Sequence, residues 1–217
     1  MESCGLSQMT NVEKYFDEID VARIRRAKEL SELKRAFAQF ATTDMLGVSS
    51  KAVVVLTYAN WEGFYNDCVN TYINFLRENG GKVRDRDWML LVGALHADFE
   101  SIKDRHYSFE SRRQFIEKLR TKLDCGFDAV DIALISARSN LDFAQITRSY
   151  DLLGFDLSDL QAKRNHINKE LVGWRHAVAH GDSPDLKTMD VNKHIDFTSQ
   201  LLTLVSDRFQ YSILERI

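Results

Sequence analysis

The sequence predicts an all-α protein that folds as an antiparallel helical bundle. Proline breaks helices, and the chain has one proline in 217 residues, which favours long uninterrupted helices. Apolar residues also recur at helical spacing in several segments. The hydrophobic share of 44% and the charged share of 28% are ordinary for a globular domain with a buried core. A chain of this length fits one domain.

The first predicted helix covers residues 11 to about 43. Its apolar positions return every three or four residues, with charged residues between them: Phe16, Ile19, Ile24, Ala27, Leu30, Leu33, Phe37 and Phe40. Such a stripe predicts an amphipathic helix with one buried face. We expect this long helix to form an N-terminal segment, residues 1–46.

The second predicted helix covers residues 51–81 and ends at a double glycine. Gly47, Ser49 and Ser50 precede it, and we expect them to interrupt the helical pattern and supply the N-terminal cap. This helix is more apolar than the first. It is therefore predicted to lie at the centre of the bundle.

The next part of the chain contains shorter elements. A polar turn at 82–87 leads into a helical stretch at 88–102, and a third helix is expected at 109–124. Residues 128–136 fit either a short strand or a linker. β-structure is therefore expected to be a minor element at most.

Ser139 and Asn140 are predicted to cap a helix over residues 141–154. Ser158 is predicted to cap the following helix, which should run from about residue 159 to Gly181. Its expected buried stripe consists of Leu160, Ile167, Leu171, Trp174 and Val178.

A final amphipathic helix is expected from about residue 190 to 209. The predicted organisation is a single domain, with a core at 48–182 and a C-terminal helix within 184–217. Pro184 separates the two, just after the glycine that ends the preceding helix.

Cysteine usage and the N-terminus indicate the cytoplasm. Cys4, Cys68 and Cys125 are too widely spaced for a CxxC pair, which suggests a reducing compartment. The N-terminus lacks the basic and apolar regions of a signal peptide, and no apolar run is long enough to span a membrane.

The formal charge of −3 argues against a general nucleic-acid coat protein but allows a local basic groove. Basic residues cluster in two places: Arg23, Arg25, Arg26 and Lys28, and then Arg112, Arg113, Lys118, Arg120 and Lys122. We interpret both clusters as solvated helix faces, because acidic residues lie among them.

The segment WRHAVAHGD, from Trp174 to Asp182, is the strongest functional signal. It contains Arg175, His176 and His180 at the end of a helix. The spacing alone is weak evidence, because this composition yields roughly 1.4 such arginine–histidine matches by chance. The position of the motif in a proline-poor chain, at a helix end followed by glycine, gives it weight.

Arginine and histidine together suit cleavage of RNA without a metal ion. The reaction starts when a 2′-hydroxyl attacks the neighbouring phosphorus, so the site must move a proton and stabilise added negative charge. His180 is the candidate for proton transfer, and the guanidinium of Arg175 would bind phosphate oxygens. His176 would orient the arginine or the phosphate.

This motif resembles that of the HEPN superfamily of RNA-processing domains, in which an arginine and a polar residue precede a histidine. Residues Leu56–Leu76 are similar to a helix of the RiboL-PSP and MAE types of HEPN-like nuclease, and Ser139–Phe143 is also similar to that group. The resemblance covers about residues 51–182. It implies a HEPN-like bundle with additional helices.

The resemblance further implies a metal-independent endoribonuclease that needs no cofactor, a toxin or antiviral effector. Its substrate would be single-stranded or loop RNA, including transfer RNA, and its products would end in 2′,3′-cyclic phosphates. HEPN domains pair so that two motifs meet in one cleft. A homodimer is therefore expected, with a further protein partner that inhibits or activates it.

Helix geometry supports the need for a second chain. Arg175 and His180 are five residues apart and therefore about 140° apart around an ideal helix, so they do not share a face. One motif would supply only part of a site. The tyrosine that some related toxins carry two residues after the motif histidine is replaced here by Asp182, which makes control by nucleotide attachment doubtful.

Other interpretations of these residues remain open at the level of sequence. Arg175 could pair with Asp182 or Glu170, and His176 with His180 could hold a metal ion, although no third ligand is evident. Glu62, in an aromatic surround, could pair with Arg175, shape the cleft or simply be exposed.

The aromatic neighbours of Glu62 are predicted to be core: Tyr58, Trp61 and Phe64. His96, His106 and His194 have no recognisable spacing and are assigned no role. The alternative to an enzyme is a helical module that binds RNA or protein without catalysis.

Overall fold

The computed structural model describes residues 2–41, 47–137, 140–182, 184, 186 and 189–216, and within them the protein is helical with no strand. An isolated backbone bridge between Lys82 and Gly126 is the nearest approach to β-structure in this part of the chain. The predicted all-α helical bundle is confirmed.

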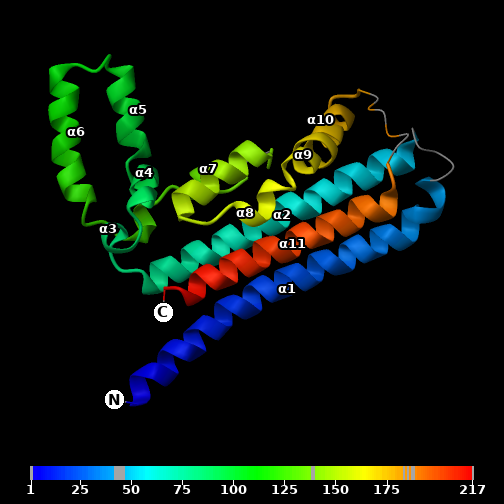
Figure 1. The fold of residues 1–217 in the computed structure, drawn as a ribbon. Helices are drawn as coiled ribbons and strands as arrows, with labels where there is room; N and C mark the ends of the chain where they lie inside the picture. Colours follow the sequence, from blue (N-terminus) through cyan, green and yellow to red (C-terminus); the bar gives the residue numbers. More distant parts are fainter. Residues whose placement is uncertain are drawn as a thin grey trace.

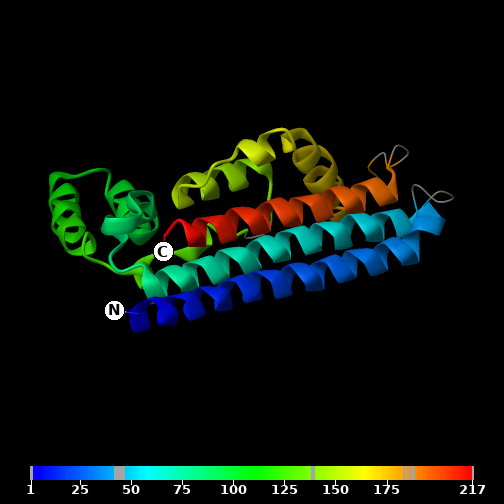
Figure 2. The same ribbon diagram turned by 60° about the horizontal axis from the view of Figure 1, so that its bottom comes forward.

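Three long helices form the main layer: α1 (Glu2–Ala41), α2 (Val48–Asn79) and α11 (Val191–Leu214). They lie side by side, with α2 and α11 running in one direction and α1 in the other (Figures 1 and 2). The amphipathic stripe of α1 explains its position, since the helix buries Tyr15, Ile19 and Leu30 against its neighbours.

A second layer of shorter elements lies over the long helices, on the side of α11 (Figure 2). It consists of α7 (Phe143–Leu153), α8 (Ser158–Gln161), α9 (Arg164–His166), the π-helical segment η4 (Ile167–Gly173) and α10 (Trp174–Ala179). Both η4 and α10 pack against α2. The motif helix is thereby held on the most buried helix of the main layer.

An arm extends beyond this body at the end where α2 stops (Figure 1). Its elements are α3 (Val83–Arg86), η1 (Trp88–Leu90), α4 (Leu91–Ala94), α5 (His96–Asp104) and α6 (Phe109–Lys122). Two short turns, η2 (Phe127–Ala129) and η3 (Ile132–Leu134), lead back to the body. Residues 128–136 were expected to form a short strand or a linker. They form neither, because 3₁₀ turns occupy much of the segment.

An aromatic cluster joins the two layers. Tyr72 of α2 meets Phe209 of α11 edge to face at 5.7 Å between ring centroids, and Phe155 lies 5.2 Å from Tyr72. Tyr72 and Phe209 are fully buried, and edge-to-face pairs add specific geometry to the hydrophobic burial. The prediction that α2 is central is confirmed.

The predicted cap of α2 is confirmed at Gly47, whereas the other residues predicted to cap helices do not do so. Gly47 is the N-cap of α2 and offers no side-chain hydrogen bond, while Ser49 and Ser50 lie inside its first turn. Asp142 caps α7 by accepting a hydrogen bond from the Gln145 amide at 2.7 Å. This role was expected for Ser139, which lies outside the described residues, and for Asn140, which lies upstream of the true cap.

The helix predicted at 159–181 is also not continuous. Asp156 accepts a hydrogen bond from the amide of Ser158 at 3.0 Å, and α8, α9, η4 and α10 then follow with changes of helical type. The predicted stop is confirmed, since Gly181 has a φ of +81°. A left-handed backbone at this position favours glycine and ends the helix.

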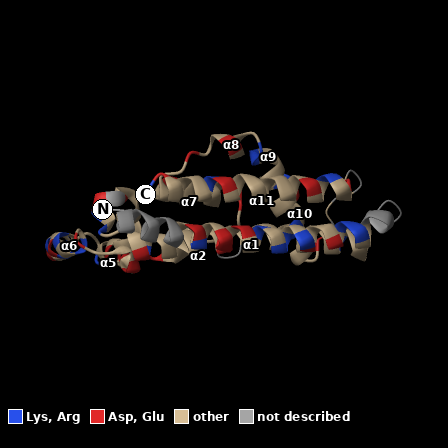
Figure 3. Ribbon diagram, turned by 90° about the horizontal axis from the view of Figure 1, so that it is seen from below, with Lys and Arg blue, Asp and Glu red and all other residues tan. Residues whose placement is uncertain are grey.

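Ion pairs account for much of the charged surface. The guanidinium of Arg25 lies 2.8 Å from the carboxylate of Asp67 on α2, and the ammonium of Lys118 lies 2.7 Å from the carboxylate of Asp98. Figure 3 shows basic and acidic residues interspersed along the helices, as predicted for solvated faces. Among the helices described, none combines the length and the hydropathy required to cross a bilayer.

Candidate functional site

The motif lies at the end of α10, where the chain turns sharply. His180 follows the last helical residue and its amide donates to the carbonyl of His176 at 3.1 Å. The amide of Asp182 then reaches back to the carbonyl of Ala177 at 2.9 Å, across Gly181. This C-terminal turn fixes the backbone of His180 at the protein surface.

The two motif histidines lie together. Both His176 and His180 are exposed, and their ring centroids are 4.3 Å apart with the planes tilted by 52°. Residues four apart on a helix share a face, which explains the contact. Two imidazoles are therefore accessible to a substrate at one helix end.

The side chain of Arg175 lies against α2, away from the two histidines. Its guanidinium carbon lies 4.6 Å from the ring centroid of Tyr58 on α2, and the arginine is half-buried. The face of an aromatic ring attracts a cation, so this contact orients the guanidinium and anchors α10 on α2.

Tyr58 connects Arg175 to two further residues. Its hydroxyl accepts a hydrogen bond from the Leu141 amide at 2.7 Å. Burial raises the pKa of Tyr58 well above its usual value. The hydrogen bond from the Leu141 amide and the charge of Arg175 oppose this rise, whereas Glu62 adds to it. The phenol therefore stays protonated and donates its hydrogen to the carboxylate of Glu62.

Within the described residues, Arg175 makes no ion pair with Glu62 and no hydrogen bond with His176 or His180. Instead, Tyr58 lies between Arg175 and Glu62, because its ring contacts the arginine and its hydroxyl interacts with the carboxylate. The arrangement agrees with the 140° separation expected from the sequence. One chain therefore presents an arginine region and a histidine region around the same helix.

The alternative partners of Arg175 are not used in this structure. Glu170 lies 3.4 Å from His166, and no ion pair in the described part of the chain joins Arg175 to Asp182 or Glu170. Tyr58 and Trp61 are confirmed as core, with 2% and 0% exposure. Sequence reasoning missed the contact of Tyr58 with Arg175, although Tyr58 and Glu62 stand four residues apart on one helix.

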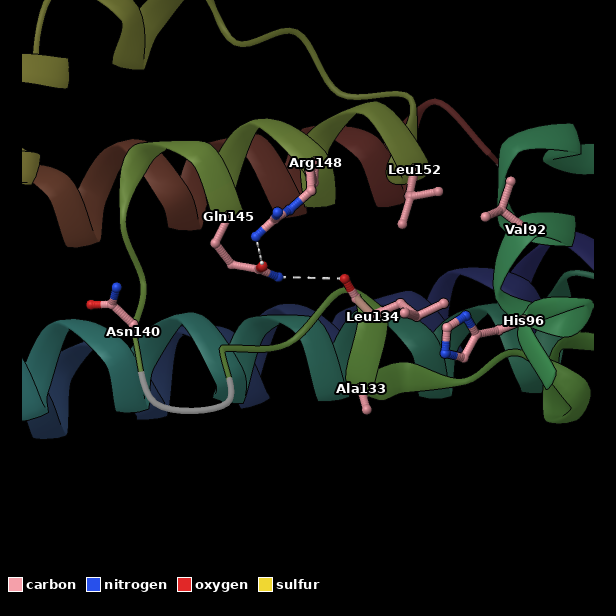
Figure 4. A pocket seen from close by; sticks show the side chains of 8 residues that line it. All are labelled: Val92, His96, Ala133, Leu134, Asn140, Gln145, Arg148 and Leu152. Carbon is pink, nitrogen blue, oxygen red and sulfur yellow. Dashed lines mark hydrogen bonds between the residues drawn. The ribbon is translucent and has the colours of Figure 1, made fainter. Parts of the chain in front are cut away.

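A separate pocket of about 410 Å³ opens beside α7 (Figure 4). Gln145 bridges two of its sides, accepting from Arg148 at 2.7 Å and donating to the carbonyl of Leu134 at 3.4 Å. His96, from α5, also lines it. None of the four predicted site residues lines this pocket, so it is distinct from the motif.

The all-helical bundle is the fold of a HEPN-like class of protein. The family model RiboL-PSP-HEPN matches residues 22–211, and the chain belongs to this family. The match takes in the C-terminal half of α1, most of α11 and the motif. No curated protein and no solved structure matches the chain. Membership supports a nuclease-like or RNA-related role.

The Tyr58 hydroxyl yields a prediction about stability. Tyr58→Phe should lower the free energy of unfolding by about 1–3 kcal/mol, because it leaves the buried Leu141 amide without its acceptor. Denaturant unfolding followed by circular dichroism measures this loss. Tyr211→Phe is the control, since Tyr211 is 53% exposed, and an equal loss in both variants would contradict the role of the hydrogen bond.

Proposed function

We propose that the protein is a metal-independent endoribonuclease that acts as a toxin or antiviral-defence effector. The exposed pair of His176 and His180 at the end of α10, next to an arginine anchored on Tyr58, is the observation that carries this proposal. Membership of a HEPN family, in which ribonucleases are common, supports it.

The chemistry follows from these groups. The 2′-hydroxyl of the substrate attacks the adjacent phosphorus, the bond to the 5′-oxygen of the next nucleotide breaks, and a 2′,3′-cyclic phosphate results. His180 transfers the proton that leaves the 2′-hydroxyl, the departing 5′-oxygen takes up a proton in return, and His176 assists by holding the phosphate. The guanidinium of Arg175 stabilises the charge that builds up on the phosphate oxygens.

The split between the arginine and histidine regions favours a homodimer. In a twofold dimer the same surface meets itself, so two copies of α10 would bring two arginines and two histidine pairs to one cleft. RNA with unpaired bases fits such an open surface, and we propose single-stranded or loop RNA, including transfer RNA. A further protein would restrain or trigger the activity.

Glu62 has a supporting role in this proposal. It touches Tyr58 and not the histidines, so it acts by holding the phenol on which Arg175 rests. Glu62→Gln should therefore reduce activity less than a change of Arg175 or His180.

A second candidate is a non-catalytic HEPN-like module that binds RNA or protein. The contact between Arg175 and Tyr58 favours it, because a half-buried arginine that already has an aromatic partner also suits a structural role. Activity in the presence of a chelator distinguishes the two candidates.

The purified protein should cleave mixed RNA in EDTA, and Arg175→Ala and His180→Ala should each lower the rate by about 100-fold or more. The fragments should carry 2′,3′-cyclic phosphates, detected by end-labelling before and after removal of the phosphate. Arg112→Ala is the matched control, because Arg112 is an exposed arginine on the distant α6. Equal inactivity of the unaltered protein and both variants on diverse RNAs would support the non-catalytic module.

A further inference from the structure

Packing brings together three potential metal ligands that are far apart in the sequence. His166 ends α9, Glu170 lies within η4 and His194 lies near the start of α11. One ligand atom from each residue lies within 4.8 Å of the other two. The His166 Nε2 and Glu170 Oε2 atoms are 3.4 Å apart.

The buried histidine of this group lacks the partners that a core histidine needs. His194 is 2% exposed, and neither ring nitrogen has a hydrogen-bond partner among the described residues. A buried polar group without a partner is costly, and such groups in native proteins call for an explanation such as a bound ion. A metal ion bound to one nitrogen of His194 would provide the missing interaction.

The surroundings hold the imidazoles in place. The ring of Phe197 stacks on His166 at 3.5 Å between centroids, and Trp174 lies 5.4 Å from His194. His166 and Glu170 are only half-buried, so an ion can enter from their side. Lys163 lies near this site, with its ammonium 5.8 Å from the centroid of the Phe197 ring.

The local helix type adds a second indication. Residues 167–173 form π-helical turns, which are rare and often occur at functional sites. Glu170 lies within these turns and His166 comes directly before them. The irregular backbone is therefore located where two of the three ligands are presented to α11.

We propose that His166, Glu170 and His194 bind a divalent transition-metal ion of the zinc type. Two imidazoles and one carboxylate are donors that zinc accepts, and a fourth position remains for water. In a tetrahedron with bonds of about 2.0–2.1 Å, ligand atoms lie about 3.3 Å apart. The 3.4 Å pair already meets this spacing, and side-chain rotation brings in the third ligand.

Such an ion would join the motif helix to α11. Trp174, the first residue of α10, contacts the ligand His194 and immediately precedes Arg175. Metal binding would thus stabilise the support of the motif without taking part in cleavage. The proposal is separate from the proposed nuclease function, whose assay in EDTA tests cleavage without metal.

Titration of the chelator-treated full-length protein with zinc, followed by calorimetry, tests the site. We expect one ion per chain and a higher melting temperature, because an ion that binds the folded state stabilises it. Glu170→Gln should weaken zinc binding at least about tenfold and reduce the thermal shift. Cobalt should give the absorption bands of a tetrahedral site, and Glu170→Gln should alter them.

The exposed histidine pair provides the matched control. The His176→Gln/His180→Gln double variant removes two surface imidazoles and should keep full zinc affinity and the full thermal shift. Loss of binding in this variant but not in Glu170→Gln would overturn the proposal, since the surface pair would then be the binding site. Absence of any thermal shift with zinc in the unaltered protein would overturn it as well.

A variant that lacks the buried His194 can fail to fold, and such a protein could not be tested. His166→Gln is therefore used as the second ligand variant. His166 is half-buried, so its replacement disturbs the core less. Folded His166→Gln and Glu170→Gln proteins that bind zinc as tightly as the unaltered chain would contradict the assignment.

Discussion

A heterodimer that combines an Arg175→Ala chain with a His180→Ala chain is expected to cleave RNA, whereas each variant alone is nearly inactive. The reason is the position of the residues: Arg175 rests on Tyr58, and His180 is exposed with His176 elsewhere around α10. In a shared cleft, the arginine of one chain would act with the histidine of the other. The heterodimer retains one residue of each kind, so we expect at least about a tenth of the unaltered activity.

The experiment uses two affinity tags, so that mixed dimers can be isolated before the RNA assay. Its control is a heterodimer of the unaltered chain with an Arg175→Ala/His180→Ala chain, which keeps both residues on one protomer. Activity in this control, together with inactivity of the heterodimer of single variants, would show that each site is built within one chain. A strictly monomeric protein that cleaves RNA would contradict the shared cleft directly.

The long helices were predictable because their signals are local. Apolar residues recur with the helical period along α11 and along α1 after residue 11, and each stripe determines which face is buried. Gly81 and Gly181 have positive φ values of 69° and 81°, which are costly for other residues. Helix ends at these glycines could therefore be located from the sequence.

The segmentation of the motif helix was not predictable from periodicity. Leu160, Ile167 and Leu171 remain buried even though the chain passes from α8 through α9 into η4. A π-turn changes the backbone bonding by one residue but leaves residues four apart close together, so the apolar stripe persists. The sequence pattern is therefore similar for a straight helix and for this interrupted one.

In the candidate site, too, the features set by nearby residues were predictable, and the contacts between distant residues were not. Arg175, His176 and His180 lie within six residues, and their spacing could be recognised directly. The contact of Arg175 with Tyr58 depends on how α10 crosses α2. Such contacts arise from packing, and the spacing of residues along one chain does not reveal them.

His194 illustrates the point most clearly. Between it and His166 lie η4, α10 and the first residues of α11, and sequence spacing assigned it no role. Its burial opposite His166 and Glu170 results from how the chain from α9 to α10 packs near α11.

Trp61→Ala is expected to destabilise the protein more than Tyr58→Phe does. Trp61 lies at the centre of α2 with no exposed surface, and its indole nitrogen donates to the Leu141 carbonyl at 3.4 Å. Truncating a buried tryptophan removes hydrophobic contacts and leaves a cavity, so the free energy of unfolding should fall by about 3–5 kcal/mol. Denaturant unfolding monitored by far-ultraviolet circular dichroism measures the loss.

Trp88→Ala is the matched control, because Trp88 is 65% exposed in η1. Its replacement should change the free energy of unfolding by no more than about 0.5 kcal/mol. Trp61→Phe separates the two contributions of Trp61, since it keeps an aromatic ring but removes the donor to Leu141. The Leu141 amide donates to the hydroxyl of Tyr58, and the ring of Tyr58 contacts Arg175, so Trp61→Phe should reduce RNA cleavage more than Trp88→Ala does. Equal effects of Trp61→Ala and Trp88→Ala on stability would contradict the buried position of Trp61.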